Sequence, residues 1–446
     1  MKKRIVILGG GESGVGAALL AQQNGYDVFI SDGGTISDAY KTELTVNNIP
    51  FEDGCHTEEK ILQAHEIIKS PGIPEKVAII LKAREKNINV ISEIEFAFRF
   101  KGESKIIAIT GSNGKTTTTA LTYHICKHAE KDCAMVGNIG YSFARQVALD
   151  PKDLYVAEIS SFQLDDIITF RPDVAVITNI TEDHLDRYEY KLEKYVQSKF
   201  RITENQLPGD VFVYNMDDAT TMKNIINYPI KSTPAPITMS KELPQGAYLV
   251  NARMHLKWKS EEMQMSVEDF AIKGKHNQYN SMAASLAATA VDIRKDKIRE
   301  ALQTFESLEH RMEPAGIIKG VEFINDSKAT NINSTWFALE SMNKPVILIL
   351  GGVDKGNDYN LLKELVKEKV KAIVCMGADN RKIHEAFGEI VSLIVNTENA
   401  KEAVQAAFHF SNKGDVVLLS PACASFDLFK NYEDRGIQFK QAVKDL

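Results

Sequence analysis

The stretch Ile106–His124, IIAITGSNGKTTTTALTYH, has the residues of a phosphate-binding loop between an apolar strand and a helix. The full P-loop pattern has a glycine five residues before the Gly-Lys pair, where this chain has Ile109. The shortened form offers backbone N–H groups to an anion, an ammonium group to the β- and γ-phosphates, and a hydroxyl to Mg²⁺. We therefore predict a nucleotide site made of Gly111, Ser112, Asn113, Gly114, Lys115, Thr116 and Thr117.

Two further chemical groups follow apolar runs in the same region. Glu158 ends the run Tyr155-Val-Ala, where a carboxylate is costly unless it is paired or bound to a metal. His184 follows the strand expected at 174–177, and open α/β sheets bind ligands at the carboxyl ends of their strands. Each residue alone could equally be a satisfied buried or surface group. Together with a P-loop, they favour a metal site.

The N-terminal segment has a second glycine turn. Gly9-x-Gly11-x-x-Gly14 follows the strand expected at 4–8, and Asp32 ends the next strand, where a ribose-binding acid would lie. The pattern favours a nucleotide or nucleotide-sugar site. An NAD(P) site and a tight turn without a ligand remain alternatives.

Two polar clusters lie further along the chain. Lys273–Asn280 begins a helix whose His276, Asn277 and Asn280 could pair with a base edge, or could be an ordinary N-cap and polar first turn. The segment 325–331 follows the strand expected at 321–324 and offers a ribose acceptor and a phosphate cation, although such residues also occur in solvated loops. Its candidates are Asp326, Lys328 and Thr330.

The elements that carry these residues alternate between strand and helix. A chain of 446 residues suggests about three domains, and the alternation predicts doubly wound α/β architecture. Short antiparallel strands are expected between 203 and 270. Further expected strands are 345–350, 373–376 and 416–419, and expected helices are 278–291 and 361–369.

Composition excludes several classes of partner. The formal net charge is −7 and the charges are interspersed, so neither nucleic acid nor an anionic membrane is an expected partner. No apolar run reaches about 18 residues and the chain enters a strand at once, which indicates the cytosol. The five cysteines have no C-x-x-C spacing, so we expect reduced thiols.

Eight segments together resemble the Mur ligase family along nearly the whole chain. They are GSNGKTT, EISSFQLD, TNITEDHLDRY, the Lys199 segment QSKFR, the helix start HNxxN, Glu309-His-Arg311, NDSKATN and SPACASFDLFKNYEDRG. The resemblance implies an α/β fold with the three-domain Mur ligase architecture. It consists of an N-terminal Rossmann-like UDP-binding domain (1–100), a central P-loop ATPase-like domain (101–307) and a C-terminal Rossmann-like amino-acid-binding domain (308–446).

The resemblance also implies a reaction. Such a ligase transfers the γ-phosphoryl group of ATP to a carboxylate, and an amino acid attacks the acyl phosphate, releasing ADP and phosphate. NDSKATN together with SPACAS points to the member that joins D-glutamate to UDP-N-acetylmuramoyl-L-alanine in peptidoglycan precursor synthesis. A cytoplasmic monomer is the implied state.

Residue roles follow from the same resemblance. Lys115, Thr116 and Glu158 would serve a first Mg²⁺, and His184 with Lys199 would serve a second, Lys199 being carbamylated by CO₂. ATP would also contact Asn277, Asn280, Arg311, Asp326 and Lys328. The UDP substrate and the amino acid would contact Gly11, Glu12, Ser13, Asp32, Ser70, Asn138, Thr330, Lys355, Ser425 and Tyr432.

The chain departs from the family pattern after Asp32. Gly33-Gly34 stands where larger polar residues often surround the uracil. Three alternatives remain: a ligase of the same or folylpolyglutamate type using another amino acid, a nucleotide-binding protein without turnover, and an NAD(P) oxidoreductase.

Overall fold

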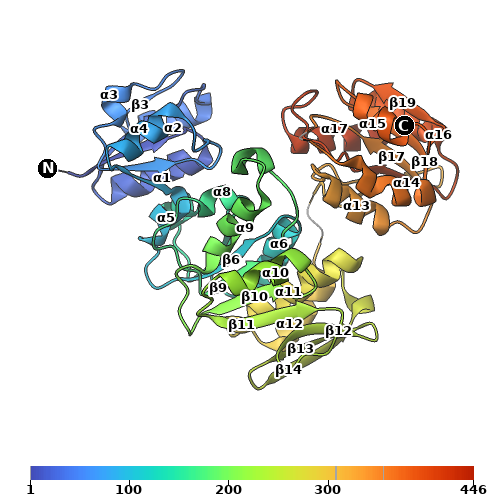
Figure 1. Cartoon of the computed structure of the whole chain (residues 1–446), viewed down its shortest axis with the longest axis horizontal. Coiled ribbons are helices and arrows are strands. Elements are labelled where there is room, and N and C mark those ends of the chain that lie inside the picture. The colour runs from blue at the N-terminus through green and yellow to red at the C-terminus, as the bar shows by residue number, and fades with distance from the viewer. Residues whose placement is uncertain (1, 307–308, 355) are drawn as a thin grey trace. The chain divides into compact units, whose positions relative to one another are not determined.

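The structure is a computed structural model that describes residues 2–306, 309–354 and 356–446, except for the side chain of Asn333. By its internal contacts the chain forms two compact units, Met1–Lys273 with Asn277–Phe305, and Gly274–His276 with Glu306–Leu446. Figure 1 shows a succession of sheets flanked by helices. Most neighbouring strands are parallel, which confirms the predicted α/β class.

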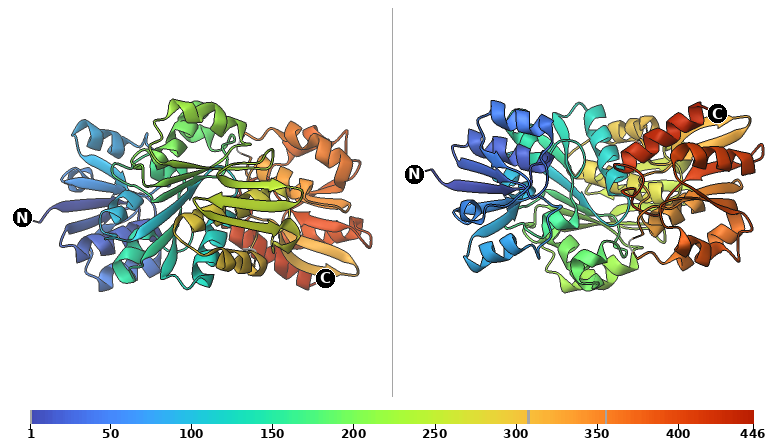
Figure 2. Two further views of the ribbon diagram at one scale, coloured as in Figure 1. Left: turned by 90° about the horizontal axis from the view of Figure 1, so that it is seen from below. Right: turned by 90° about the horizontal axis from the view of Figure 1, so that it is seen from above.

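The first unit begins with a parallel sheet of strand order β3-β2-β1-β4-β5. Separate apolar clusters cover its two faces, and in Figure 2 its strands lie between two layers of helices. The strands are β1 (Arg4–Leu8), β2 (Asp27–Ser31), β3 (Phe51–Glu52), β4 (Glu66–Lys69) and β5 (Asn89–Ser92), and the helices are α1 (Glu12–Gln23), α2 (Asp38–Val46), α3 (Glu58–Ile61), α4 (Ala78–Glu85) and α5 (Glu93–Phe98).

A second sheet in the same unit has the order β14-β13-β12-β11-β10-β9-β6-β8-β7. Its β12–β14 end is an antiparallel meander, as the sequence predicted for this region. The strands are β6 (Lys105–Thr110), β7 (Cys133–Gly137), β8 (Leu154–Glu158), β9 (Val174–Ile177), β10 (Val211–Asn215), β11 (Thr233–Thr238), β12 (Gly246–Val250), β13 (Arg253–Trp258) and β14 (Glu261–Ser266). The helices are α6 (Lys115–His128), α7 (Phe143–Leu149), α8 (Ser161–Leu164), α9 (Leu192–Phe200), α10 (Ala219–Asn224), α11 (Lys275–Ala290) and α12 (Lys295–Thr304), with 3₁₀ turns η1 (Leu185–Tyr188), η2 (Arg201–Thr203), η3 (Ile225–Asn227) and η4 (Val267–Asp269).

Helices α1 and α7 join the two sheets of the first unit. The middle of α1 is buried, and a Cβ atom on Gly16 would lie 2.1 Å from Ser142 Oγ and 2.9 Å from the backbone nitrogen of Arg145. Only glycine permits so close an approach of one helix to the start of another.

The second unit has a sheet of order β15-β16-β20-β17-β18-β19. Strand β15 is antiparallel to β16, which the sequence analysis did not predict. Lys319 and Gly320 connect them with φ of 49° and 84°, the backbone of a tight hairpin turn. The strands are β15 (Glu313–Ile318), β16 (Val321–Asn325), β17 (Val346–Leu350), β18 (Val370–Met376), β19 (Ile394–Thr397) and β20 (Val416–Leu419), and the helices are α13 (Ile332–Glu340), η5 (Tyr359–Leu362), α14 (Lys363–Lys369), α15 (Arg381–Phe387), α16 (Ala400–Phe410) and α17 (Tyr432–Lys444).

The predicted elements agree with the structure except at some ends. The strands expected at 4–8, 174–177 and 416–419 coincide with β1, β9 and β20, whereas the helix expected from Gln278 already begins at Lys275. The domain boundaries at 100/101 and 307/308 stay predictions, and residues 307 and 308 lie outside the described residues. None of the described helices has the length and apolar character needed to cross a bilayer.

The close approach at Gly16 gives a stability prediction. Gly16→Val should destabilise the first unit by about 1–3 kcal/mol, because an overpacked contact must be relieved by backbone movement. A thermal melt should show this as a decrease of several degrees in the apparent melting temperature. Gly209→Ala is the control, since a Cβ atom there meets nothing within 4 Å. Equal melting temperatures for both variants would contradict the packing argument.

Candidate functional site

The shortened P-loop connects β6 to α6 at the carboxyl edge of the second sheet. Gly114 is the N-cap of α6 with φ of 80°, and Gly111 has φ of 148°. A Cβ atom on Gly111 would lie 2.0 Å from Thr178 Oγ1. The two glycines are therefore required both by backbone conformation and by a close neighbour.

The segment after β9 holds this loop in place. Ser112 donates its backbone N–H to the Asn179 carbonyl (2.8 Å), and Thr178 Oγ1 donates to the Asn113 carbonyl (2.6 Å). Ser112 Oγ donates to the Thr181 carbonyl at 2.8 Å. Sequence reasoning did not assign a role to Thr178 or Asn179, because only the pairing of β6 with β9 brings them beside the loop.

Two lysines meet at one backbone oxygen of the P-loop. Lys115 Nζ donates to the Gly111 carbonyl at 2.8 Å, and Lys199 Nζ, from α9, donates to the same oxygen at 2.7 Å. Lys199 is 1% exposed. Its burial, and then the charge of Lys115, lower the pKa of the Lys199 ammonium well below its usual value. Burial and the neighbouring ammonium group therefore both favour loss of the Lys199 proton.

Glu158 supplies a carboxylate with one uncommitted oxygen. Its Oε1 accepts a hydrogen bond from Asn138 Nδ2 at 2.8 Å, whereas the buried Oε2 has no hydrogen-bond partner among the described residues. A buried carboxylate oxygen without a donor is costly, and a divalent cation would satisfy it. Thr116, in the first turn of α6, is the other oxygen donor that the sequence analysis assigned to this site, and oxygen ligands are those that Mg²⁺ prefers.

His184 lies at a strained position. It is the N-cap of η1 with φ of 52°, and its ring packs edge-on against Phe162 at a centroid distance of 5.3 Å. No group of three or more His, Cys, Asp or Glu side chains in the described part of the chain could hold a metal.

The start of α11 lies beside the P-loop. Asn280 Oδ1 accepts a hydrogen bond from Thr118 Oγ1 at 3.1 Å, and a Cβ atom on Gly114 would lie 2.5 Å from the same oxygen. Asn280 Nδ2 donates to Asn277 Oδ1 at 3.1 Å. The structure therefore brings these two predicted nucleotide residues together with the loop.

The residues predicted at the first glycine turn make structural contacts of their own. Asp32 Oδ2 accepts from the Gly10 N–H at 2.6 Å and its Oδ1 from the Gly34 N–H at 2.8 Å, so this carboxylate shapes the turn. Glu12 pairs with Arg145 at 2.8 Å. Ser70 lies beside the turn, where its Oγ would be 2.5 Å from a Cβ atom on Gly9. Gly11 and Ser13 occupy the N-cap and first turn of α1.

In the second unit, Asp326 is buried after β16 and accepts a hydrogen bond from Ser420 Oγ at 2.9 Å. Burial raises the pKa of this carboxyl to about 7, although the charge of Arg311 acts in the opposite direction. Lys328 Nζ lies 5.1 Å from the centre of the Tyr432 ring. Ser425 is buried, Thr330 follows Lys328 in the same loop, and Lys355 lies outside the described residues.

Arg435 is a functional candidate that sequence reasoning missed. It is fully buried and donates to Ser327 Oγ (2.9 Å), the Ser327 carbonyl (2.7 Å) and the Cys423 carbonyl (3.2 Å). It thereby ties the Asp326–Thr330 loop to the SPACAS segment. The run Tyr432-Glu-Asp-Arg435-Gly was visible, but nothing in it indicated that this arginine points inward.

The fold and the site together define a nucleotide-dependent α/β enzyme. Along the chain, the sheet that carries the P-loop comes between two other α/β sheets. Family models match residues 4–78 (MurD N-terminal domain), 109–288 (Mur ligase middle domain) and 310–423 (Mur ligase, glutamate ligase domain). The chain belongs to the Mur ligase family.

Relatives with curated names are similar along the whole chain. A UDP-N-acetylmuramoylalanine–D-glutamate ligase from Christiangramia forsetii is 53% identical over 446 residues, and one from Bacteroides fragilis is 49% identical over 445 residues, with 100% of both chains covered in each case. Among solved structures, a pseudomurein peptide ligase type C from Methanothermus fervidus has a TM-score of 0.62 at 21% identity, covering 100% of both chains. A UDP-N-acetylmuramate-alanine ligase from Thermotoga maritima has a TM-score of 0.61 at 19% identity, with the same coverage. The predicted three-domain Mur ligase architecture is confirmed.

The buried Asp326 carboxyl predicts a pH dependence of stability. Between about pH 4, where an aspartate titrates in the unfolded chain, and about pH 7, the folded state holds a proton that the unfolded state has lost. Stability should therefore fall as pH rises through this window, by about 1.4 kcal/mol per pH unit. Asp326→Asn cannot titrate at this position. The free energy of unfolding of this variant minus that of wild type should therefore increase with pH. Denaturant titrations of both proteins from about pH 4 to 8 measure this difference in free energy of unfolding. A difference that does not change with pH would contradict the prediction.

Proposed function

We propose that the protein is an ATP-dependent ligase that joins D-glutamate to UDP-N-acetylmuramoyl-L-alanine through an acyl phosphate, releasing ADP and phosphate. This reaction belongs to peptidoglycan precursor synthesis. Relatives that are about half identical along the entire chain have this activity in their names. We place the reaction in the cytoplasm and propose that the protein acts as a monomer.

The observation that carries the proposal is the meeting of Lys115 and Lys199 at the Gly111 carbonyl, with Asn138 orienting Glu158 nearby in the fold. A structural turn has no need of two lysine amines at one oxygen. Ligation does need positive charge there, because a phosphoryl donor and an anionic acceptor repel one another. Lys115 would supply that charge directly, and carbamylated Lys199 would supply it by holding Mg²⁺.

The chain's own residues have separable tasks in this reaction. Lys115 would leave the loop carbonyls for the β- and γ-phosphates, while the loop N–H groups and the start of α6 hold the anion in place. Thr116 and the free oxygen of Glu158 would hold one Mg²⁺, and His184 with modified Lys199 a second. Mg²⁺ supplies charge neutralisation between the phosphates and the acceptor carboxylate.

Lys199 is proposed to be carbamylated. In its neutral form the amine has a lone pair that can attack CO₂, giving a carbamate R–NH–COO⁻ and releasing one proton. The product has an anionic oxygen where an ammonium group would repel a metal ion. The low pKa of Lys199 supports the proposal, because a protonated amine cannot form the N–C bond.

The substrates are tested by omission. Phosphate release from ATP should require both UDP-N-acetylmuramoyl-L-alanine and D-glutamate for full turnover. L-Alanine, L-lysine and meso-diaminopimelate in place of D-glutamate distinguish a ligase for another amino acid. Equal turnover with one of these, or none with D-glutamate, would refute the amino-acid assignment.

Lys115→Ala should reduce kcat/KM by about a hundred- to thousandfold or more, because it removes a positioned cation that stabilises charge in transfer. Steady-state phosphate release measures the loss. Lys127→Ala is the matched control, an exposed lysine at the other end of the same helix, and should keep wild-type turnover. A Lys115→Ala variant with near wild-type turnover would exclude the phosphate role.

Lys199→Ala should lose activity and also a carbamate signal in ¹³C NMR spectra recorded with labelled bicarbonate. A short-chain carboxylic acid should restore part of the activity, since it supplies the missing anionic oxygens. Lys194→Ala is the control for removing a lysine from α9, because Lys194 is exposed on this helix and pairs with Glu189 at 2.8 Å. It should keep both the activity and the carbamate signal. A wild-type spectrum without a signal that depends on Lys199 would reject the modification.

A further inference from the structure

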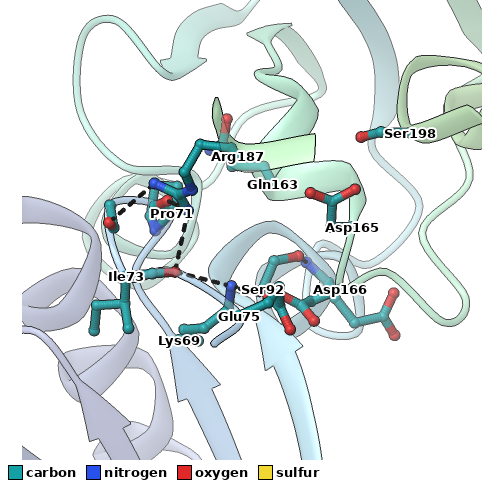
Figure 3. Close-up of polar contacts among 12 residues, drawn as sticks. Lys69, Pro71, Ile73, Glu75, Ser92, Gln163, Asp165, Asp166, Arg187 and Ser198 are labelled. Carbon is teal, nitrogen blue, oxygen red and sulfur yellow. Dashed lines mark hydrogen bonds and ion pairs between the residues drawn. The ribbon is translucent and has the colours of Figure 1, made fainter. Parts of the chain in front are cut away.

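The loop that follows β4 is held by two cations from different parts of the first unit. Lys69 ends β4, and its Nζ donates to the Ile73 carbonyl at 3.2 Å. Arg187, in η1 of the second sheet's region, donates to the carbonyls of Pro71 (3.4 Å), Gly72 (3.3 Å) and Ile73 (3.3 Å). In Figure 3 the Ile73 carbonyl oxygen is contacted by Arg187 from above and by Lys69 from the right.

These bonds account for the backbone acceptors of the loop. The Ser70 carbonyl closes a turn with the Ile73 N–H at 3.1 Å, and the next three carbonyls go to the two cations. A loop carbonyl that loses its donor must take water or another side chain as its partner, and neither would hold three carbonyls in one arrangement as a single guanidinium does. The position of this loop is therefore tied to the position of the Arg187 guanidinium.

Lys69 itself is fixed by a buried ion pair. It is 2% exposed and lies 2.9 Å from Asp166 Oδ2, which is equally buried, and it also contacts Glu75. Asp166 belongs to the region of the second sheet, so the pair joins that region to the end of β4. The buried ion pair therefore anchors the loop through Lys69. A shift of the loop can then be transmitted only through its contacts with Arg187.

Arg187 is also tied to His184. The backbone N–H of Arg187 donates to the His184 carbonyl at 3.0 Å. Both side chains also pack against Phe162: the Arg187 guanidinium lies 4.3 Å and the His184 imidazole 5.3 Å from the centre of its ring. His184 is held at φ of 52° in this short turn. A movement of Arg187 must therefore move His184 or break these contacts.

We propose that Arg187 is a positioning residue that couples occupancy of the UDP subsite to the placement of His184. The inference rests on the proposed function, because it takes Ser70 and the first glycine turn as the UDP subsite and His184 as a metal ligand. A uridine diphosphate group bound against the Ser70–Ile73 loop fixes its carbonyls, these fix Arg187, and Arg187 holds η1 in the arrangement that presents His184.

Hydrogen exchange tests the coupling without metal or ATP. In EDTA, UDP-N-acetylglucosamine supplies the UDP-sugar but no acceptor peptide carboxylate that could reach His184 directly. In wild type it should slow exchange in residues 9–16 and 69–76, and slow residues 181–190 by about fivefold or more. In Arg187→Gln, residues 9–16 and 69–76 should still respond, and residues 181–190 should not.

Arg84→Gln is the matched control. Arg84 belongs to the same charged cluster, pairing with Glu75 and with Asp166 at 2.9 Å, but it donates to none of the three loop carbonyls that Arg187 binds. It should keep the wild-type response in all three segments. Arg187→Lys keeps the positive charge but loses the forked geometry of the guanidinium, so the exchange response of residues 181–190 should be intermediate. This variant replaces Arg187→Gln if circular dichroism shows that Arg187→Gln is unfolded.

Kinetics give a second readout. Arg187→Gln should raise the Mg²⁺ concentration for half-maximal rate at saturating UDP-N-acetylmuramoyl-L-alanine by about tenfold, and KM for this substrate at saturating Mg²⁺ by a similar factor, because coupling between two binding sites is reciprocal. Arg84→Gln should leave both values within about threefold of wild type.

The proposal is overturned if residues 181–190 respond equally in wild type and Arg187→Gln, or if they do not respond in wild type while residues 9–16 do. If UDP-N-acetylglucosamine protects neither 9–16 nor 69–76, the UDP subsite is wrong and the inference falls with it. The substrate-omission assay tests the ligase activity independently of either result.

Discussion

The sharing of the Gly111 carbonyl by two lysine amines is the constraint on which the site depends. Two ammonium groups at one oxygen repel each other, and burial adds to the free-energy cost of charging Lys199. Lys115 remains in the loop, where an anionic phosphate can attract it away, whereas Lys199 is enclosed by α9 and the sheet. The arrangement therefore lowers the pKa of the Lys199 amine well below its usual value, while Lys115 lies in the loop itself.

One segment after β9 serves three parts of the first unit. Its beginning, at Thr178 and Asn179, fixes the P-loop, its middle includes His184, and its end, at Arg187, holds the loop after β4. Because these contacts lie within about ten residues of chain, the nucleotide loop, a candidate metal ligand and the first sheet are linked by a short path.

Long cationic side chains recur as caps for loop carbonyls in both units. Arg187 and Lys69 hold the loop after β4, Arg435 holds the loop after β16, and Lys369 donates to three carbonyls at the end of α13. Irregular backbone leaves acceptors without partners, and a multidentate donor satisfies several of them at once. The loops near the candidate sites thus acquire defined positions without regular secondary structure.

Local patterns determined much of this protein. The apolar runs predicted β1, β9 and β20, the glycine spacing predicted the two turns, and Lys115 was assignable because its neighbours in the chain form the loop that it serves. The inward direction of Arg435, the Asn138–Glu158 hydrogen bond and the Arg187 contacts could not be predicted, because each joins residues that only strand order and helix packing bring together. The hairpin at Lys319-Gly320 is local, but Lys-Gly is not one of the residue pairs that signal such a turn most strongly. The sequence by itself therefore determined the types of chemical group and the elements that carry them. Tertiary structure decided which groups share a partner, and hence that the pKa of Lys199 is lowered well below its usual value, because pKa depends on burial and on neighbouring charges.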